Sequence, residues 1–130
     1  MIVFRLDAAT GVPTYLQLVQ QVEDALRVGQ LQVGDQLPKV REVVAGLAIN
    51  PNTVLKAYRD LESRGLLEGR PGQGTFVTAT LGEVPFSAHA SLRRSLTKWL
   101  AAARLAGLDE AAIGALFSTT LHETRSEGAA

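Results

Sequence analysis

The sequence predicts a mainly α-helical fold, in which an N-terminal winged helix-turn-helix (three helices plus a β-hairpin wing) is followed by a two-helix C-terminal element. Two observations indicate this class. Apolar residues recur at the three- and four-residue spacing of an amphipathic helix in five separate segments. After the third segment, two β-rich runs enclose a loop rich in glycine and proline, which is typical of a hairpin.

The first two elements that we expect are a short strand and a helix. Residues 2–6 contain three successive β-formers, which favours a strand. The helix should run from Pro13, because a first turn tolerates proline, to about Gly29, because glycine is common just after a helix end. Its apolar face comprises Tyr15, Leu18, Val19, Val22, Ala25 and Leu26.

Two further helices should follow after a connector, with a tight break between them. Pro38 opens the second, and Asn50 and Pro51 mark the start of the third, because asparagine caps a helix and proline suits its first position. The third helix should reach about Arg64, before Gly65. The inward residues are Val40, Val43, Val44 and Leu47 in the second helix and Val54, Ala57, Tyr58 and Leu61 in the third.

The rest of the chain should form the hairpin and the C-terminal helices. We expect strands at residues 66–68 and 75–78 around a loop at residues 69–74. A boundary near residue 80 then separates a winged domain, residues 1–80, from a helical region, residues 81–130, that contains two helices and a loose tail.

Bulk composition excludes several classes of protein. The 130 residues are 46% hydrophobic, contain no cysteine and carry a formal net charge of zero. Disulfides and thiolate metal sites are therefore excluded, and no apolar run is long enough for a membrane span. The first residues lack the basic and apolar segments of a signal peptide. We expect a cytoplasmic protein with no cofactor, no metal site and no membrane contact.

The charges are unevenly distributed along this neutral chain. Residues 36–80 carry six basic and four acidic side chains, whereas residues 1–35 carry two basic and four acidic ones, and residues 81–130 carry five of each. The predicted second and third helices and the hairpin are thus the basic part of the chain, which weakly favours a nucleic-acid partner there.

The third helix has a polar stripe opposite its apolar face. Asn52, Lys56, Arg59 and Ser63 are spaced by four, three and four residues, and Thr53 lies in the first turn. The major groove of DNA accepts one helix, so reading residues must share one face; asparagine can pair with adenine, and lysine with guanine or a phosphate. The alternative is an ordinary solvated face. The preceding short helix, the Asn-Pro start and the following hairpin favour DNA recognition.

The hairpin loop could contact DNA beside this helix. Gly72 and Gly74 allow the backbone to approach phosphates, Gln73 can hydrogen-bond, and Arg70 can enter a narrow minor groove. For a hairpin on its own, turn geometry would explain both glycines. Arg41 in the second helix is placed either to bind the DNA backbone or to reach inward towards the bases.

Three motifs together resemble the GntR family of bacterial regulators, over residues 10–80. They are Gly34-Asp35-x-Leu37-Pro38-x-x-Arg41-Glu42, then Asn50-Pro51-Asn52-Thr53-Val54-x-Lys56-Ala57-Tyr58, and Gly72-x-Gly74-Thr75-Phe76-Val77. The Asn-Pro-Asn-Thr-Val form and the short tail are similar to the YtrA branch. The resemblance implies a homodimeric, usually repressing regulator, with operator contacts from Arg41, Asn52, Thr53, Lys56 and the wing at residues 72–74.

This sequence departs from the family pattern at some positions. Lys39 replaces a usual serine, which adds attraction for phosphate but places a cation at the positive end of a helix. Leu55 stands where many relatives have arginine, so that contact cannot be transferred. The candidate DNA-binding residues are Lys39, Arg41, Asn50, Asn52, Thr53, Lys56, Arg59, Arg70, Gly72, Gln73 and Gly74.

The two C-terminal helices predict a homodimer. Two amphipathic helices cannot bury their apolar stripes alone, so we expect them to pack on a second copy. The candidate dimerisation residues are Leu92, Leu96, Trp99, Leu100, Ile113, Leu116, Phe117 and Leu121. A symmetric dimer predicts a palindromic, double-stranded operator. A small-molecule effector could bind at the dimer interface around Trp99, although interface packing is the more common role of such a tryptophan.

The sequence disfavours two other classes of function. An enzyme is disfavoured, because His89 and His122 have no metal-binding spacing and no nucleophile or phosphate-loop motif is present. A winged helix used only for protein contacts would need apolar or aromatic anchors on its exposed face, whereas the stripe of the third helix is polar and basic.

Overall fold

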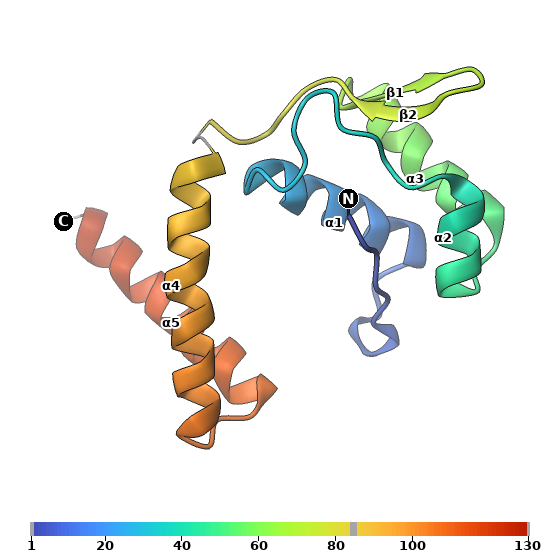
Figure 1. The fold of residues 1–130 in the computed structure, drawn as a ribbon. Helices are drawn as coiled ribbons and strands as arrows, with labels where there is room; N and C mark the ends of the chain where they lie inside the picture. The colour runs from blue at the N-terminus through green and yellow to red at the C-terminus, as the bar shows by residue number, and fades with distance from the viewer. Residues whose placement is uncertain (1, 84–85, 130) are drawn as a thin grey trace. The chain divides into compact units, whose positions relative to one another are not determined.

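The computed structural model describes residues 2–83 and 86–129 (Figure 1). The chain divides into two compact units, Met1–His89 and Ala90–Ala130. Along the described residues a short 3-10 helix, η1 (Ala8–Thr10), precedes three α-helices, an antiparallel hairpin and two longer helices. The predicted fold class is confirmed: the structure is mainly helical, with a helix-turn-helix and a wing in the first unit. None of the helices described is long and apolar enough to span a membrane.

Helix α1 (Thr14–Arg27) has the boundaries that its flanking residues dictate. The carbonyl of Pro13 accepts hydrogen bonds from the amides of Leu16 and Gln17, at 3.0 and 3.1 Å, so proline stands just before the first turn. Beyond the other end, Gly29 adopts a φ of 76°, a conformation that ends helices and favours glycine. The helix packs against α3.

The predicted strand at residues 2–6 is wrong. The segment lies beside α1, and glutamine side chains bind its backbone in place of a neighbouring strand. The Gln21 side chain accepts from the Arg5 amide at 3.0 Å and donates to the Arg5 carbonyl at 2.7 Å. Gln17 binds Asp7 in the same way, at 2.9 and 3.0 Å. The β-forming residues serve packing instead, since Phe4 is buried in the core.

Helices α2 (Val40–Leu47) and α3 (Pro51–Ser63) form the helix-turn-helix. The second helix begins two residues later than we predicted, because Pro38 is held outside it by a bond to α3 and Lys39 is the N-cap. Ala48 takes a left-handed conformation, with φ of 54°, that turns the chain sharply. The side chain of Asn50 then accepts from the Asn52 amide at 2.8 Å, which confirms the predicted cap of α3.

One buried hydrogen bond joins α3 to the residue that precedes α2. The hydroxyl of Tyr58 donates to the carbonyl of Pro38 at 2.5 Å, and both residues are buried. Burial raises the pKa of Tyr58 above its ordinary value, and the nearby negative charge of Glu42 raises it further. The neutral hydroxyl therefore fixes the entry of α2 relative to α3.

The wing is the hairpin of β1 (Leu67–Arg70) and β2 (Gly74–Val77). The register pairs Leu67 with Val77 and Arg70 with Gly74. The loop is therefore shorter than we predicted: residues 69, 70 and 74 belong to the strands, because a ladder uses backbone groups and glycine satisfies them as well as other residues do. The connector at residues 34–37 lies along the other edge of β2, through bonds such as Leu37 N–H to the Thr75 carbonyl, 2.8 Å.

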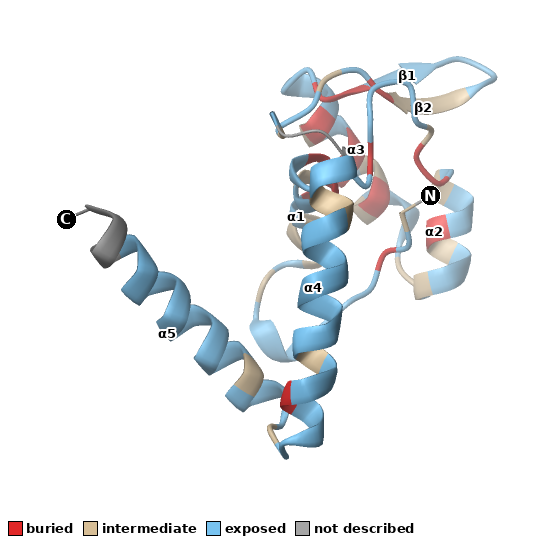
Figure 2. Ribbon diagram, turned by 60° about the vertical axis from the view of Figure 1, so that its left-hand side comes forward, coloured by how far each residue is buried: buried red, intermediate tan, exposed pale blue. Residues whose placement is uncertain are grey.

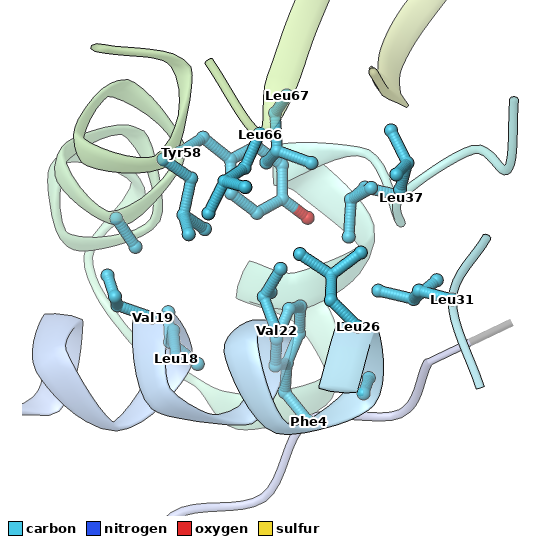
Figure 3. Close-up of a cluster of buried hydrophobic side chains, with 14 of the residues drawn as sticks. Phe4, Leu18, Val19, Val22, Leu26, Leu31, Leu37, Tyr58, Leu66 and Leu67 are labelled. Carbon is cyan, nitrogen blue, oxygen red and sulfur yellow. The ribbon is translucent and has the colours of Figure 1, made fainter. Parts of the chain in front are cut away.

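The core of the first unit lies between α1, α3 and the base of the wing (Figure 3). Figure 3 shows Val22 and Leu26 of α1 pointing towards Tyr58, Leu66 and Leu67. Every inward residue that we predicted for α3 is buried. The fully buried large side chains are Leu18, Val19, Val22, Leu26, Leu31, Leu37, Val54, Leu61 and Val77.

The second unit consists of most of α4 (Phe86–Leu105) and of α5 (Glu110–Ala129). Asp109 caps α5 by accepting from the Ala112 amide at 2.8 Å, as predicted. The helix continues through residues 126–129, where we expected a loose tail, because no proline interrupts it. In Figure 2 the two helices diverge from their turn and are coloured almost entirely as exposed; within the described part of this unit, Ala103 alone is buried.

Removing the Tyr58 hydroxyl should destabilise the first unit. Tyr58→Phe leaves the Pro38 carbonyl without its donor, so we expect the free energy of unfolding to fall by about 1–2 kcal/mol at neutral pH. Because the pKa is raised in the folded state, the stabilisation is present below the unfolded value of 10.0 and is lost as the pH rises above it. The phenylalanine variant should lose less stability than the parent above about pH 10, as measured by urea unfolding; equal losses would contradict this role.

Candidate nucleic-acid interface

The outer face of α3 is polar and lies outside the core of the first unit. Asn52, Lys56 and Arg59 are all exposed, on the side of the helix opposite the buried residues. Ser63, at the end of the same stripe, directs its hydroxyl to the Asp60 carbonyl at 2.7 Å. The structure thus presents two cations and one amide on a single helical face, which is the arrangement that fits one groove of a duplex.

The first turn of α3 is fixed by its own cap. The Asn50 side-chain oxygen accepts from the Asn52 amide, so Asn50 orients the turn, and its side-chain NH₂ stays available as a donor to a ligand. Thr53 is half-buried, and its amide donates to the Asn50 carbonyl at 3.0 Å. Asn52 has an exposed side chain, so it is the residue of this turn best placed to reach a base edge.

An open hollow of about 410 Å³ lies between this turn and the start of α1. Thr14 and Tyr15 of α1 line it together with Asn50, Asn52, Thr53 and Lys56. The Lys56 ammonium lies 4.0 Å from the centre of the Tyr15 ring, a cation–π distance. Among the residues that the structure describes, no acidic side chain lines the hollow, so its electrostatics suit an anion.

The cations of the first unit fall into two groups. Among the residues described, Lys39, Arg41, Lys56 and Arg59 form no ion pair, and all four are exposed. Of the cations outside the helix-turn-helix, Arg5 likewise forms no ion pair among the residues described, whereas Arg27 pairs with Glu23 and Asp24 at 3.7 Å, and Arg64 with Glu23 at 3.4 Å and Asp60 at 3.6 Å. Within the described part of the first unit, most of the unpaired positive charge therefore lies at the start of α2 and on α3.

The side chain of Arg70 lies across the surface of the wing. The Arg70 guanidinium lies 4.3 Å from the centre of the Phe76 ring and 3.6 Å from a Glu68 carboxylate oxygen. The tip is a tight turn, in which the Gln73 amide donates to the Arg70 carbonyl at 2.9 Å. Gly72 has a φ of 75° with open space around it, as the third position of a type II turn requires.

All eleven candidate DNA-binding residues lie in the first unit, distributed over the start of α2, α3 with its N-cap, and the wing. Sequence reasoning missed three further residues: Thr14, Tyr15 and Gln36. Tyr15 has the helical spacing of a core residue, but it is only half-buried and shares the hollow with Lys56. Gln36 lies in a connector, and nothing in the local sequence indicates that its side chain touches the wing.

The second unit offers an apolar surface. Leu96 and Trp99 of α4 and Leu116, Phe117 and Leu121 of α5, with two threonines, line a groove of about 330 Å³. Of these apolar residues, Trp99 is 36% exposed and Phe117 49%, large fractions for such side chains. Leu92, a further predicted member of the stripe, is 67% exposed, whereas Leu100 and Ile113 are half-buried.

Comparison with known proteins shows one consistent family. The family described as "Bacterial regulatory proteins, gntR family" matches residues 14–77. The chain is 39% identical over 74 residues to the HTH-type transcriptional repressor YtrA of Bacillus subtilis (strain 168), a match that covers 57% of this chain and 57% of the repressor. The chain thus spans little more than half of that relative.

Among the solved structures that match, two illustrate the similarity of fold. YtrA from Sulfolobus acidocaldarius, a GntR-family transcription factor, is 30% identical with a TM-score of 0.53, over 75% of this chain and 97% of that one. The AraR DNA-binding domain in complex with operator ORX1 is 26% identical with a TM-score of 0.50, over 59% and 93%. In the AraR structure, the DNA-binding domain is bound to its operator.

Proposed function

Because this chain belongs to the GntR family of bacterial transcriptional regulators, we propose that it is a repressor that binds a palindromic operator as a homodimer. The relatives that match it are transcriptional regulators rather than enzymes. Residues 1–80 are the DNA-binding domain, and residues 81–130 are the dimerisation region. In the bound state α3 lies in the major groove, and the wing at residues 69–75 lies at the minor groove.

The observation that carries this proposal is the unpaired polar face of α3. Lys56 and Arg59 have no carboxylate partner among the residues described, so DNA phosphates or base acceptors can bind them without an ion pair first being broken. Asn52 can give bidentate hydrogen bonds to adenine, and Lys56 can reach guanine. Lys39 and Arg41, at the start of α2, then contact the backbone beside the groove.

The hollow at the start of α1 extends this surface. A phosphate of the operator fits there, because the lining combines a lysine with hydroxyl and amide groups and lacks acidic residues. The contact with the Tyr15 ring restricts the Lys56 side chain in the free protein. The lysine therefore loses less conformational entropy when it binds DNA. Thr14 and Tyr15 therefore join the candidate DNA-binding residues.

The wing adds contacts to the neighbouring minor groove. Its tip carries two glycines in left-handed conformations, with φ of 75° at Gly72 and 127° at Gly74, so its backbone can approach a phosphate closely. Arg70 lies on the strand that leads into the tip. The pair with Glu68 at 3.6 Å is solvent-exposed and weak, so a narrow, electronegative minor groove can compete for this arginine.

The exposed groove of the second unit supports the homodimer. Two helices that expose Trp99, Phe117 and five leucines leave a large apolar surface in water, which favours burial against an identical surface. A two-fold axis through such an interface would place two copies of α3 for two half-sites about one turn of DNA apart, or somewhat more. The operator is therefore an inverted repeat.

Selection of bound sequences from random DNA tests the proposed function directly. The purified full chain should enrich an inverted repeat, and a duplex with that repeat should bind far more tightly than random DNA of equal length. Fusing the selected site to a reporter promoter should give lower transcription when the protein is present. Failure to enrich any sequence would reject DNA recognition, whereas enrichment of a single half-site would reject the symmetric dimer.

Loss of Lys56 should weaken the specific complex. Lys56→Ala removes a cation from the middle of the reading face, and we expect the operator affinity to fall by about tenfold or more. The slope of log affinity against log salt should also become shallower by about one. Arg27→Ala is the matched control, because it removes a cation that is already ion-paired at the far end of α1. Equal effects of the two substitutions in a fluorescence-anisotropy titration would contradict the assignment.

The Tyr15 ring should matter more than its hydroxyl for the position of Lys56. Tyr15→Leu removes the cation–π contact, and we expect operator affinity to fall by about two- to fivefold. Tyr15→Phe keeps the ring and should lose less. The comparison uses gel-shift titrations at one salt concentration, and equal losses in both variants would show that the ring does not support the lysine.

A charge in the apolar groove should break the homodimer. Phe117→Asp places a carboxylate where the partner would bury it, so we expect the dimer dissociation constant to rise by at least about tenfold, as measured by sedimentation equilibrium. Leu105→Asp is the control, because Leu105 is 92% exposed and does not line the groove. Equal dimerisation of both variants would place the interface elsewhere.

A further inference from the structure

Gln36 lies in the connector between α1 and α2, and its backbone is tied to the wing. Gln36 faces Phe76 across an antiparallel bridge. On either side, the Leu37 amide donates to the Thr75 carbonyl at 2.8 Å and the Val77 amide donates to the Asp35 carbonyl at 2.8 Å. The main chain at Gln36 is therefore fixed beside β2. Its side chain starts from this fixed position and extends towards the wing.

The side chain of Gln36 ends at the tip of the wing. Its Nε2 donates to the Gln73 carbonyl at 3.0 Å. The same nitrogen lies only 2.6 Å from where a Cβ would stand on Gly74, too close for any other residue at that position unless the amide moved. Glycine is favoured here chiefly by the φ of 127° at Gly74, because the end of the flexible Gln36 side chain could move away from a Cβ.

This contact completes the bonding of the tip. The Gln73 amide already donates to the Arg70 carbonyl, so with Gln36 both backbone polar groups of Gln73 are satisfied within the protein. Four-residue strands make a hairpin that is only marginally stable by itself. A tether from the connector therefore decides whether the tip is already ordered when it meets DNA. Arg70 is affected too, because it is paired with Gly74 across the hairpin.

We propose that Gln36 is a positioning residue for DNA recognition, which holds the wing tip and Arg70 in their binding conformation without touching the operator. The inference rests on the proposed function, because it concerns how tightly the protein binds its operator. Without this amide the tip must be ordered during binding, and the entropy lost then weakens the complex. The loss of affinity should come from the wing, and the contacts of α3 with DNA should stay intact.

The test compares two glutamines of the same connector. Gln36→Met keeps the length of the side chain but removes the donor. Gln32→Met is the control, because the Gln32 amide lies 3.4 Å from the Gly29 carbonyl, a backbone contact of the same kind that does not involve the wing. Operator affinity is measured for the parent and for both variants over a range of salt concentrations, alongside thermal unfolding.

We expect Gln36→Met to bind the operator about three- to tenfold more weakly, which corresponds to the loss of about one net hydrogen bond. The salt slope should become shallower by about one if Arg70 no longer reaches its phosphate-lined groove. Arg70→Ala should cost much less in the Gln36→Met background than in the parent, because both changes disable the same contact. Gln32→Met should bind like the parent.

Several results would overturn the proposal, and they differ from those that would overturn the function. If the parent protein binds no specific DNA, the proposed function fails first. If the parent binds and Gln36→Met binds equally well, or if Arg70→Ala costs the same in both backgrounds, Gln36 does not act through the wing. NMR of the parent protein gives a check that needs no variant: nuclear Overhauser effects should join the Gln36 side-chain amide to the Gly74 α-protons, with and without operator, and their absence would also overturn it.

Discussion

The burial of one face of α3 is the constraint on which the first unit depends. Val54, Ala57, Tyr58 and Leu61 lie on one side of a helix with 3.6 residues per turn, and α1 packs against this side. The residues between them must then face outward, whatever their chemistry. Because those outward residues are polar and cationic, the packing that stabilises the fold is also what presents the reading face. A shift of one residue in the register of α3 would bury a lysine or an arginine, so stability and recognition are selected together.

The neutral net charge of the chain hides a local arrangement that suits DNA. Long-range attraction to a duplex scales with the unpaired charge near the contact, and interactions between exposed charges are screened beyond about 8–10 Å at physiological salt. Acidic groups placed on α1 and at the end of α3 neutralise the arginines there. The helix-turn-helix keeps its four cations without such partners among the residues described. Composition alone therefore underestimates the affinity for nucleic acid, and the three-dimensional pairing of charges is the better guide.

Local signals in the sequence predicted the helices, but they did not predict contacts between residues that are far apart in the sequence. Asn50 marked the start of α3 because a cap acts within three residues, and periodicity identified the buried face for a similar reason. The strand expected at residues 2–6 failed because Gln21, far along the chain, binds that backbone. Tyr15 and Gln36 escaped notice on the same ground: one meets Lys56 and the other meets Gln73, across separations of 41 and 37 residues that no local pattern encodes.

The two units differ in where they bury their apolar residues. This difference explains why the C-terminal helices could be predicted as secondary structure, whereas the surface that would cover them could not. The first unit buries its apolar residues within itself, so its fold follows from its own pattern. The second exposes its apolar groove, and the geometry that would cover it depends on a second chain. A single winged unit offers few base contacts, and linking two through a dimer raises the effective concentration of the second at its half-site. Affinity for an operator then rises most when the linkage is stiff. In the proposed homodimer, the weakly packed helices of one copy would gain that stiffness by burying their apolar faces against the other, so dimerisation and recognition would be energetically coupled.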